Sequence, residues 1–212
     1  MSTKRVVICG VARTPIGSFM GTLSSISAVD LGIMAVKELC SRVGFDPASG
    51  IVDDVYFGQV LQAGSGQNPA RQVTLGAGLP ITTSASTINK VCGSSLEAAM
   101  LAANSILAGK SKVVVAGGME SMSNAPQLLI GQRKGKKMGD SKLIDSMIHD
   151  GLWDVYNDIH MGNTGETVAQ ENDITRNDSI ANALSGGWHS VMVSDIRGCV
   201  VQDSVYIPEN SE

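Results

Sequence analysis

The sequence predicts an α/β fold in which helices are layered on a largely parallel sheet. The first observation is an alternation along the chain: short apolar runs of strand length are separated by segments with helical spacing, in the order β-α-β-α-β-α-β. The second is the presence of 24 glycines against 6 prolines among 212 residues, as expected where many strands turn tightly into helices. The hydrophobic fraction of 43% is enough for a packed core and is too high for a disordered chain.

The first three predicted elements lie before residue 60. Val6–Gly10 is a short apolar run that ends in glycine, which is typical of a buried strand. Ala28–Cys40 is predicted to be helical, and Val52–Gly58 is predicted to be the second strand. The helix is indicated by apolar residues spaced three or four apart on one face, namely Val29, Ile33, Val36 and Cys40.

The next four elements complete the alternation. Asn68 is a good N-cap and Pro69 suits the first helical position, so a short helix is expected to about Leu75. Thr82–Val91 is predicted to be a strand, and Lys112–Ala116 is predicted to be another that closes on two glycines. Between these strands a helix is expected over residues 94–107, with one apolar stripe formed by Leu96, Met100, Ala103 and Leu107.

The character of the chain changes after Gly118. Residues 119–175 contain few strand-like runs and many Met, Gly, Ser, Asn and Asp residues, so a boundary is expected between residues 118 and 125. Such excursions from the sheet of an α/β protein usually carry substrate specificity. The basic run Gln132–Lys137 is either a solvated surface loop or a loop that contacts an anion or another subunit.

Charge and cysteine content narrow the function classes. The net charge of −4 does not indicate a nucleic-acid-binding protein. The four cysteines, at positions 9, 40, 92 and 199, form no C-x-x-C pair, so neither a disulfide framework nor a metal site is predicted. No secretory segment and no apolar run long enough for a bilayer is present, so we expect a cytoplasmic chain that does not enter a membrane.

Cys92 is the candidate nucleophile. A lone cysteine is more often a small buried hydrophobe, and we apply that interpretation to Cys9 and Cys40. Cys92, in contrast, follows a predicted strand and precedes a predicted helix, whose free N–H groups and positive end favour a thiolate. Gly93 allows a sharp turn and the close approach of a substrate carbonyl, whereas the carboxylate of Glu97 opposes the effect of the helix.

Five stretches of the chain resemble the thiolase family, specifically its acetyl-CoA acetyltransferases. They are the nucleophile segment Val91–Ser95, the opening Ala12–Gly17, the strand–helix unit Gly58–Arg71, the signature Gly117–Pro126 and the loop-domain start Asp150–Gly162. Together they fall within residues 5–178 and occur in the order of the family, which is more specific than any single short motif.

The resemblance implies a thiolase-like β-α-β-α-β-α-β half with a largely parallel layered sheet, followed by part of an irregular loop domain. The implied divisions are an N-terminal α/β domain over residues 1–120, a partial coenzyme A-binding loop domain over 121–178 and a divergent tail over 179–212. Cys92 would take an acetyl group from acetyl-CoA, and a second acetyl-CoA would then give acetoacetyl-CoA. Leu152, His160 and Met161 would line the pocket for coenzyme A, although without the family His160 would be a loop histidine that makes a hydrogen bond. Coenzyme A thioesters would be substrates, and no permanently bound cofactor or metal is implied.

The chain departs from the family beyond about Asp178. The family continues with a Gly-His-Pro histidine, an Asn-Glu-Ala segment and a second cysteine in Cys-x-Gly-Gly-Gly, and none of these motifs occurs here. Since a general acid or base supplies roughly 10²–10⁴-fold in rate, we expect Cys92 alone to be a slow thiol.

Three functions compete at this point. The first is an active thiolase, which is expected to be a homo-oligomer. The second is a catalytically incomplete thiolase half that pairs with full-length subunits and modulates them. The third, a dinucleotide-binding oxidoreductase, is disfavoured because Gly10 is followed by Val11-Ala12-Arg13 rather than by a G-x-G-x-x-G motif.

Overall fold

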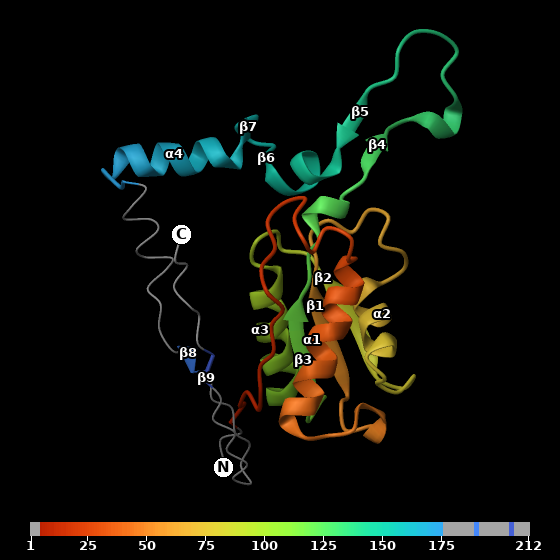
Figure 1. The fold of residues 1–212 in the computed structure, drawn as a ribbon, viewed down its shortest axis with the longest axis vertical. Coiled ribbons are helices and arrows are strands. Elements are labelled where there is room, and N and C mark those ends of the chain that lie inside the picture. The colour runs from red at the N-terminus through yellow and green to blue at the C-terminus, as the bar shows by residue number, and fades with distance from the viewer. Residues whose placement is uncertain (1–4, 176–188, 191–203, 206–212) are drawn as a thin grey trace.

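The computed structural model describes residues 5–175, 189–190 and 204–205. Its main body is built on a three-stranded parallel sheet, in which β1 (Asp54–Gly58) lies between β2 (Ser84–Ile88) and β3 (Val114–Gly118) (Figure 1). Asp54 is in register with Ser84 on one side and with Val114 on the other. The predicted α/β class with a parallel sheet is therefore confirmed.

The two helices that precede β2 have well-defined ends. The helix α1 (Ala28–Val43) begins after Ser27, whose Oγ accepts a hydrogen bond from the Asp30 N–H at 3.1 Å. It ends at Gly44, whose φ of +77° favours glycine, and it is therefore three residues longer than predicted. The helix α2 (Pro69–Gly76) has the predicted cap, because the Asn68 side chain accepts from the N–H of Arg71 at 3.3 Å.

Successive residues of β1 serve opposite faces of the sheet, as strand geometry requires. Val55 and Phe57 are buried in the core formed with α1 and α2, whereas Asp54 and Gly58 meet the ends of α3 (Ser94–Leu107). The sheet is thus covered by α1 and α2 on one face and by α3 on the other (Figure 1). The members of the main core are Ala28, Val36, Cys40, Val52, Val55, Phe57, Ala70, Val73, Ala77, Leu79, Val115 and Met119.

The helix α3 packs on the sheet with its small residues and directs its large ones outward. Its buried residues are Ser94, Ala98, Ala102 and Ser105. The predicted apolar stripe does lie on one side of the helix, but Leu96 is 68% exposed, Met100 43% and Leu107 50%. Leu96, Met100 and Leu107 are therefore on the surface of the described chain, whereas Leu101 and Ile106 are half-buried.

A small polar network fixes the far end of α3. The Ser105 and Ser111 hydroxyls lie 2.7 Å apart, and the Ser111 Oγ donates a hydrogen bond to the carboxylate of Asp54 at the start of β1. All three side chains are buried, so the two serines depend on this network, while Asp54 has the Lys110 ammonium at 3.7 Å as a further partner.

The predicted strand Val6–Gly10 is wrong, because the structure contains no strand in these residues. The segment instead runs beside α1: a Cβ on Gly10 would lie 2.4 Å from the Val43 side chain, and Arg42 donates to the Val11 carbonyl at 3.4 Å. An apolar run indicates burial but does not identify a strand that it pairs with. Within the described residues β3 pairs only with β1, so residues 6–10 do not extend the sheet beside β3. Cys9 consequently is exposed, which corrects the expectation that it is a buried hydrophobe, whereas Cys40 is 1% exposed as expected.

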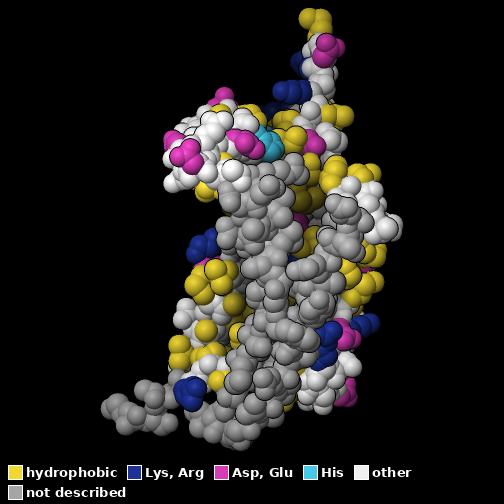
Figure 2. Space-filling view, turned by 60° about the vertical axis from the view of Figure 1, so that its left-hand side comes forward, with side chains coloured by type: hydrophobic (Ala, Val, Ile, Leu, Met, Phe, Trp, Pro, Cys, Tyr) yellow, Lys and Arg dark blue, Asp and Glu magenta, His cyan; other side chains and the backbone are white. Residues whose placement is uncertain are grey.

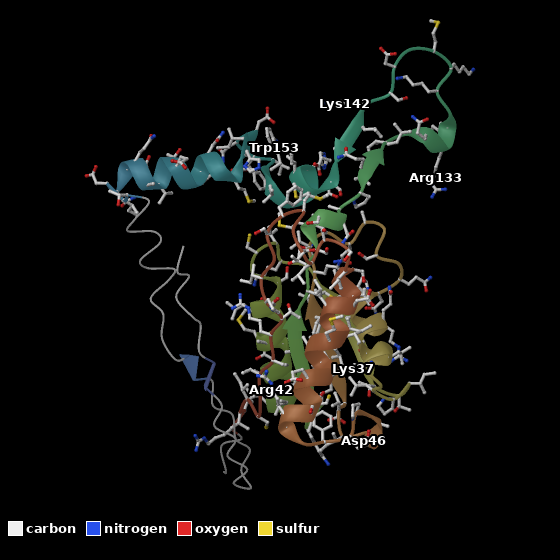
Figure 3. All side chains as sticks on the ribbon, viewed as in Figure 1. Lys37, Arg42, Asp46, Arg133, Lys142 and Trp153 are labelled. Atoms are coloured by element: carbon white, nitrogen blue, oxygen red, sulfur yellow. The ribbon has the colours of Figure 1, made fainter. Side chains whose placement is uncertain are left out.

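Beyond β3 the chain leaves the sheet as predicted for residues 119–175. Two short antiparallel hairpins and one helix project from the body (Figure 1). The basic run lies between β4 and β5, where its side chains are exposed, and Figure 3 shows Arg133 of this run on the part of the chain that projects from the body. The elements of this part are η2 (Met122–Asn124), β4 (Gln127–Leu129), η3 (Gln132–Lys134), β5 (Leu143–Asp145), η4 (Met147–Leu152), β6 (Trp153–Asp154), β7 (Ile159–His160) and α4 (Met161–Glu171).

Three short elements complete the description: η1 (Pro47–Ser49), and the strands β8 (His189–Ser190) and β9 (Ser204–Val205), which pair with each other. The predicted domain boundaries at 120 and 178 stay predictions, and most of the tail at 179–212 lies outside the described residues. In the part that the structure describes, no helix has the length and apolar character needed to cross a bilayer.

Candidate functional site

Cys92 lies in a tight turn between β2 and α3. The strand β2 ends at Ile88, the helix begins at Ser94, and the Cys92 side chain is exposed between them. The strand–turn–helix arrangement predicted for this cysteine is therefore present. In a parallel sheet such turns gather at the carboxyl edge, where α/β proteins bind their ligands.

The backbone of this turn is strained and held in place. Val91 has a φ of +49°, a left-handed conformation that is rare for a β-branched residue and costs of the order of 1–3 kcal/mol. Its N–H donates to the Asn89 Oδ1 at 3.0 Å, and its carbonyl accepts from the Ser94 hydroxyl at 2.5 Å and from the Ser94 N–H at 3.1 Å. These bonds compensate the strain and fix the position from which Cys92 extends.

At the start of α3, the N–H groups of Gly93 and Ser94 donate to the carbonyls of Lys90 and Val91, both at 3.1 Å, so the helix leaves the N–H groups of the next two residues without an intrahelical partner. Gly93 is the N-cap and offers no side-chain acceptor to the first turn. The opposing charge of Glu97 is met by Lys90, since the Lys90 Nζ forms an ion pair with the Glu97 Oε2. The sequence analysis did not assign Lys90 a role. The lysine seven residues before Glu97 was the only indication in the sequence that the charge of Glu97 is compensated.

Two glycines allow α3 to approach the sheet this closely. A Cβ on Gly58 would lie 2.7 Å from the Ser95 nitrogen and 2.8 Å from the Ser94 carbonyl carbon and Cβ. A Cβ on Gly118 would lie 1.9 Å from the Ser95 Oγ. The first turn of α3 therefore rests on the last residues of β1 and β3, and this contact sets the height of Cys92 above the sheet.

Glu120 organises the loop beside this turn. Its two carboxylate oxygens accept from the Val60 N–H at 2.9 Å and from the Leu61 N–H at 3.2 Å. Burial raises the pKa of the Glu120 carboxyl, and the two hydrogen bonds oppose that rise. The sequence analysis gave Glu120 no role, although it lies inside the Gly117–Pro126 signature, and the structure shows that it positions the loop after β1.

Gln59 is the buried polar residue of the same loop. Its amide nitrogen donates to the Leu61 carbonyl and to the Ser65 hydroxyl, both at 3.0 Å, while its Oε1 has no hydrogen-bond partner. These bonds stiffen the loop that Glu120 also holds. No signal in the sequence distinguished this glutamine from the others.

The three residues predicted to bind coenzyme A lie close together along the second hairpin. Leu152 is the last residue of η4, and the next residue, Trp153, pairs with His160 across β6–β7. Figure 3 shows Trp153 between the body and α4. The His160 Nδ1 accepts from the Gly162 N–H at 3.0 Å and caps α4, on which Met161 is the first residue. This is the hydrogen bond expected of a loop histidine, and a ligand contact of His160 stays a prediction.

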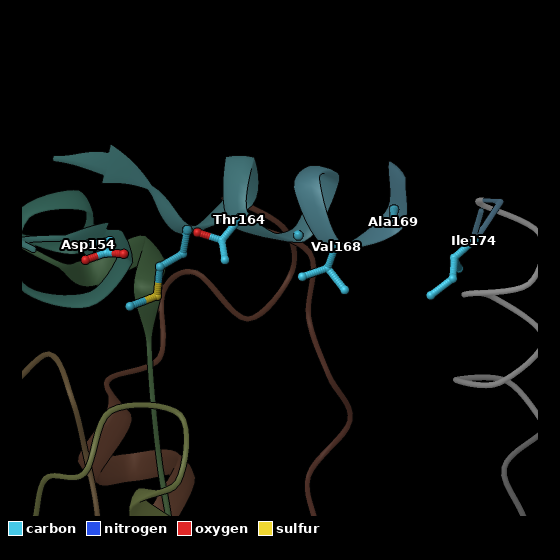
Figure 4. A pocket seen from close by; sticks show the side chains of 7 residues that line it. Asp154, Thr164, Val168, Ala169 and Ile174 are labelled. Carbon is cyan, nitrogen blue, oxygen red and sulfur yellow. The ribbon is translucent and has the colours of Figure 1, made fainter. Parts of the chain in front are cut away.

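An apolar groove runs along the underside of α4. It has a volume of about 500 Å³ and includes Met161 but neither Leu152 nor His160. Figure 4 shows Thr164 and Val168 pointing into it from the helix, with Asp154 at one end and Ile174 at the other. Only one of the three predicted contacts therefore lines this groove.

The Cys92 turn and the second hairpin are linked through the loop after β1. A Cβ on Gly151, the residue before Leu152, would lie 3.2 Å from the Leu61 side chain. The neighbouring Val60 carbonyl accepts from the Asn89 side chain at 3.4 Å, and Asn89 also holds the Cys92 turn. The two predicted parts of the site are thus joined by packing and hydrogen bonds, although their residues come from distant positions in the chain.

Neither His149 nor His160 is hydrogen-bonded to Cys92 in this structure. His149 pairs with Asp150 at 2.7 Å, and the His160 Nδ1 accepts from the Gly162 N–H, so the partner of each lies within two residues of it. Among the described residues, no group of three or more His, Cys, Asp or Glu side chains is placed to hold a metal ion. The arrangement can therefore present an exposed thiol at the start of a helix to a carbonyl group, and in the part of the chain whose side chains are described neither histidine is paired with that thiol.

Comparison with known proteins agrees with the resemblance. Residues 6–188 match the family described as Thiolase, N-terminal domain. The acetyl-CoA acetyltransferase of Cupriavidus necator is 57% identical over 171 residues, covering 81% of this chain and 43% of that protein. An acetyl-CoA acetyltransferase of Pseudomonas aeruginosa is 51% identical over 200 residues, covering 94% and 50% respectively. A probable acetyl-CoA acetyltransferase of Escherichia coli is 53% identical over 182 residues, covering 86% and 46%. The chain spans about half the length of these relatives.

Proposed function

Because the chain belongs to the thiolase family, we propose that it carries out acyl transfer as an acetyl-CoA C-acetyltransferase, with Cys92 as the residue that holds the acyl group. The observation that carries this proposal is the exposed Cys92 in a constrained turn at the start of α3. The N–H groups of Ser95 and Leu96, in the first turn of α3, have no acceptor within the helix and can bind the oxyanion formed at the attacked carbonyl.

In the first step the thiolate of Cys92 attacks the carbonyl carbon of acetyl-CoA. The bond from that carbon to the coenzyme A sulfur breaks, coenzyme A leaves and takes up the proton that Cys92 lost, and acetyl-Cys92 remains. In the second step the methyl group of another acetyl-CoA loses a proton, and the resulting carbanion attacks the acetyl group on Cys92. Acetoacetyl-CoA forms and the Cys92 thiolate is released, and the reverse sequence is thiolysis.

The second step needs a base for the methyl proton, and a positioned base typically contributes about 10²–10⁴-fold. The described residues show no such group hydrogen-bonded near Cys92, so the first step is the part of the reaction that this region supports best. We propose coenzyme A thioesters as substrates, with no cofactor that stays bound.

We propose that Leu152, His160 and Met161 contact the coenzyme A portion. The apolar lining beside Met161 supports this for the pantetheine chain, which is long and only partly polar. The contact between Gly151 and Leu61 supports it as well, because it keeps this segment next to the loop that adjoins the Cys92 turn.

The first step can be tested by intact-mass spectrometry of the full chain after incubation with acetyl-CoA. We expect one acetyl group on the wild type and on Cys9→Ser, which removes the other exposed thiol among the described residues, and none on Cys92→Ser. An acetyl group that persists in Cys92→Ser would refute the assignment of the nucleophile. A folded wild type without any adduct would refute the proposal that this region alone accepts the acyl group.

A second function is favoured by the β4–β5 hairpin, namely binding to full-length thiolase subunits and modulating them. Ile130, Met138 and Leu143 are exposed on this hairpin together with the basic run, and exposed apolar residues beside charged ones are typical of an interaction surface. Mixing the chain with the Cupriavidus necator relative tests it. Mixed oligomers with a changed activity per full-length subunit support this function, and separate elution with unchanged activity contradicts it.

We further propose a cytoplasmic location and homo-oligomeric assembly, with no binding of nucleic acid or membranes. The location is supported by Cys40 and Cys92, which are thiols and not disulfides and suit a reducing compartment. The absence of nucleic-acid binding is supported by the net charge of −4.

A further inference from the structure

Lys90 and Cys92 belong to the same four-residue turn before α3. The Gly93 N–H closes this turn by donating to the Lys90 carbonyl at 3.1 Å, so Cys92 lies between the two bonded residues. A Cβ on Gly93 would lie 3.9 Å from the Lys90 Cγ, so the stem of the lysine passes beside the residue that follows the cysteine. The turn therefore carries a primary amine together with the residue proposed to hold the acyl group.

The Lys90 side chain is long enough to reach an acetyl group on Cys92. The Cα atoms of residues two apart are separated by at most about 7 Å, and a turn shortens that distance. A lysine carries its amine on a flexible stem, about 6 Å from its own Cα. Since the acetyl carbonyl carbon would be bonded directly to the Cys92 Sγ, rotation of the lysine side chain can bring the two groups together.

In this structure an ion pair holds the amine away from that position. The Lys90 Nζ pairs with the Glu97 Oε2 in the first turn of α3. The Lys90 side chain is 59% exposed, and ion pairs of exposed groups are weak. Exposed side chains also change rotamer quickly, so the amine leaves Glu97 for part of the time.

We propose that Lys90 is an acyl acceptor, to which the acetyl group of acetyl-Cys92 passes when the amine leaves Glu97. This rests on the proposed function, because it needs an acetyl group on Cys92. The Lys90 ammonium loses one proton to the solvent, and the neutral amine attacks the acetyl carbonyl carbon. A C–N bond forms, the bond from that carbon to the Cys92 Sγ breaks, and a second proton passes from the nitrogen to the leaving thiolate.

The products of this step are an acetylated Lys90 and a free Cys92 thiol. Resonance stabilises the amide that forms, so the transfer runs in one direction. It removes the acetyl group from the route to acetoacetyl-CoA. It also removes the positive charge of Lys90, so Glu97 loses the cation with which it pairs.

Lys110 is a matched control within the same chain. Its side chain is 65% exposed, close to the value for Lys90, and its ammonium also lies near a carboxylate, that of Asp54 at 3.7 Å. It follows the other end of α3, whose 14 residues span about 21 Å, so it cannot reach Cys92. Figure 2 shows Lys and Arg side chains at several separate places on one face of the molecule. Direct acetylation by acetyl-CoA in solution would therefore label several lysines, whereas transfer from Cys92 selects Lys90.

Peptide mass mapping tests the transfer after the full chain has been incubated with isotopically labelled acetyl-CoA and quenched in acid. Hydroxylamine removes a thioester and leaves an amide, so it separates acetyl-Cys92 from acetylated Lys90. We expect hydroxylamine-stable acetylation of Lys90 at about ten times the level of Lys110 or more, because the transfer is intramolecular. The same result is expected in Cys9→Ser, whereas in Cys92→Ser the acetylation of Lys90 falls to the level of Lys110.

Glu97→Gln tests the ion pair. We expect the ratio of acetylated Lys90 to acetyl-Cys92 to rise about two- to fivefold, as the loss of one exposed ion pair allows. An unchanged or lower ratio overturns the restraint by Glu97. Circular dichroism verifies that every variant is folded.

Three outcomes overturn the transfer itself. Acetyl-Cys92 without acetylated Lys90 refutes the transfer and leaves the proposed function intact. Acetylation of Lys90 that persists in Cys92→Ser refutes it as well, because the acetyl group then comes directly from acetyl-CoA. A folded wild type without acetyl-Cys92 refutes the proposed function and this inference together.

Discussion

Gly58→Ala is the substitution that most directly tests the contact between β1 and the start of α3, next to Cys92. The new Cβ would lie within 2.8 Å of three atoms in the first turn of α3, and two of those are backbone atoms that cannot rotate away. Contacts below 3.0 Å do not persist, so the start of α3 must move away from β1 by some tenths of an ångström.

The cost follows from two opposing effects. Overpacking of this kind costs about 1–3 kcal/mol, whereas replacing a strand glycine by alanine recovers about 0.5–1 kcal/mol of backbone entropy. We therefore expect Gly58→Ala to lower the free energy of unfolding by about 1–2 kcal/mol. Since the turn rests on the same contact, the rate of Cys92 alkylation is also expected to change in the folded state.

The assay is urea unfolding followed by circular dichroism, together with iodoacetamide labelling of the folded protein. The matched control is Gly165→Ala in α4, where an added Cβ meets nothing within 4 Å. That variant is expected to be equally stable or slightly more stable, because alanine favours helix. The reasoning is refuted if Gly58→Ala unfolds at the same urea concentration as the wild type and Cys92 is labelled at the same rate. In that case the close contact of α3 with β1 does not position Cys92.

Three further predictions concern stability and reactivity. Backbone N–H groups at residues 112 and 113 donate to the Asp53 carboxylate and lower the pKa of Asp53. The stability that Asp53 contributes is therefore fully present above the pKa of the unfolded state, about 4, and is lost as the pH falls through the lower pKa of the folded state. Asp53→Asn should therefore lose less stability than the wild type between about pH 5 and pH 3 in urea titrations, and an equal loss would contradict this. Ser111→Ala should cost about 1–3 kcal/mol in thermal or urea unfolding, because it removes the hydroxyl bonded to the buried Asp54 carboxylate and leaves the Lys110 ammonium at 3.7 Å, and no change would show that the bond is dispensable. Burial raises the pKa of the Cys40 thiol, so iodoacetamide should label Cys92 first and Cys40 only after unfolding, as peptide mass mapping would show.

Several parts of the site could be predicted from the chain alone because they depend on neighbours in sequence. Asn68 and Pro69 define the start of α2 through local capping, and the Ser94–Leu107 helix has the predicted bounds. Cys92 could be singled out because its position between a strand-like run and a helical run is itself local information. The family could be recognised for the same reason, since its motifs are short and occur in order.

Other parts depend on what packs against them, and periodicity does not contain that information. The run at residues 6–10 has the composition of a strand, yet it lies beside α1, because strand formation requires a backbone partner. Similarly, Glu120 is sixty residues from the Val60 N–H to which it is bonded, and no local pattern links the two.

The sequence by itself determined the α/β class, the start of α2, the bounds of α3 and the family, and it singled out Cys92 as the candidate nucleophile, because capping, spacing and short motifs act over a few residues. The tertiary structure decided which side of α3 meets the sheet. Small residues allow closer contact than large ones, so Ala98 and Ala102 pack against the sheet while Leu96 and Leu107 are exposed. It also decided how closely the first turn of α3, next to Cys92, packs on β1, since that distance depends on Gly58 having no side chain at all.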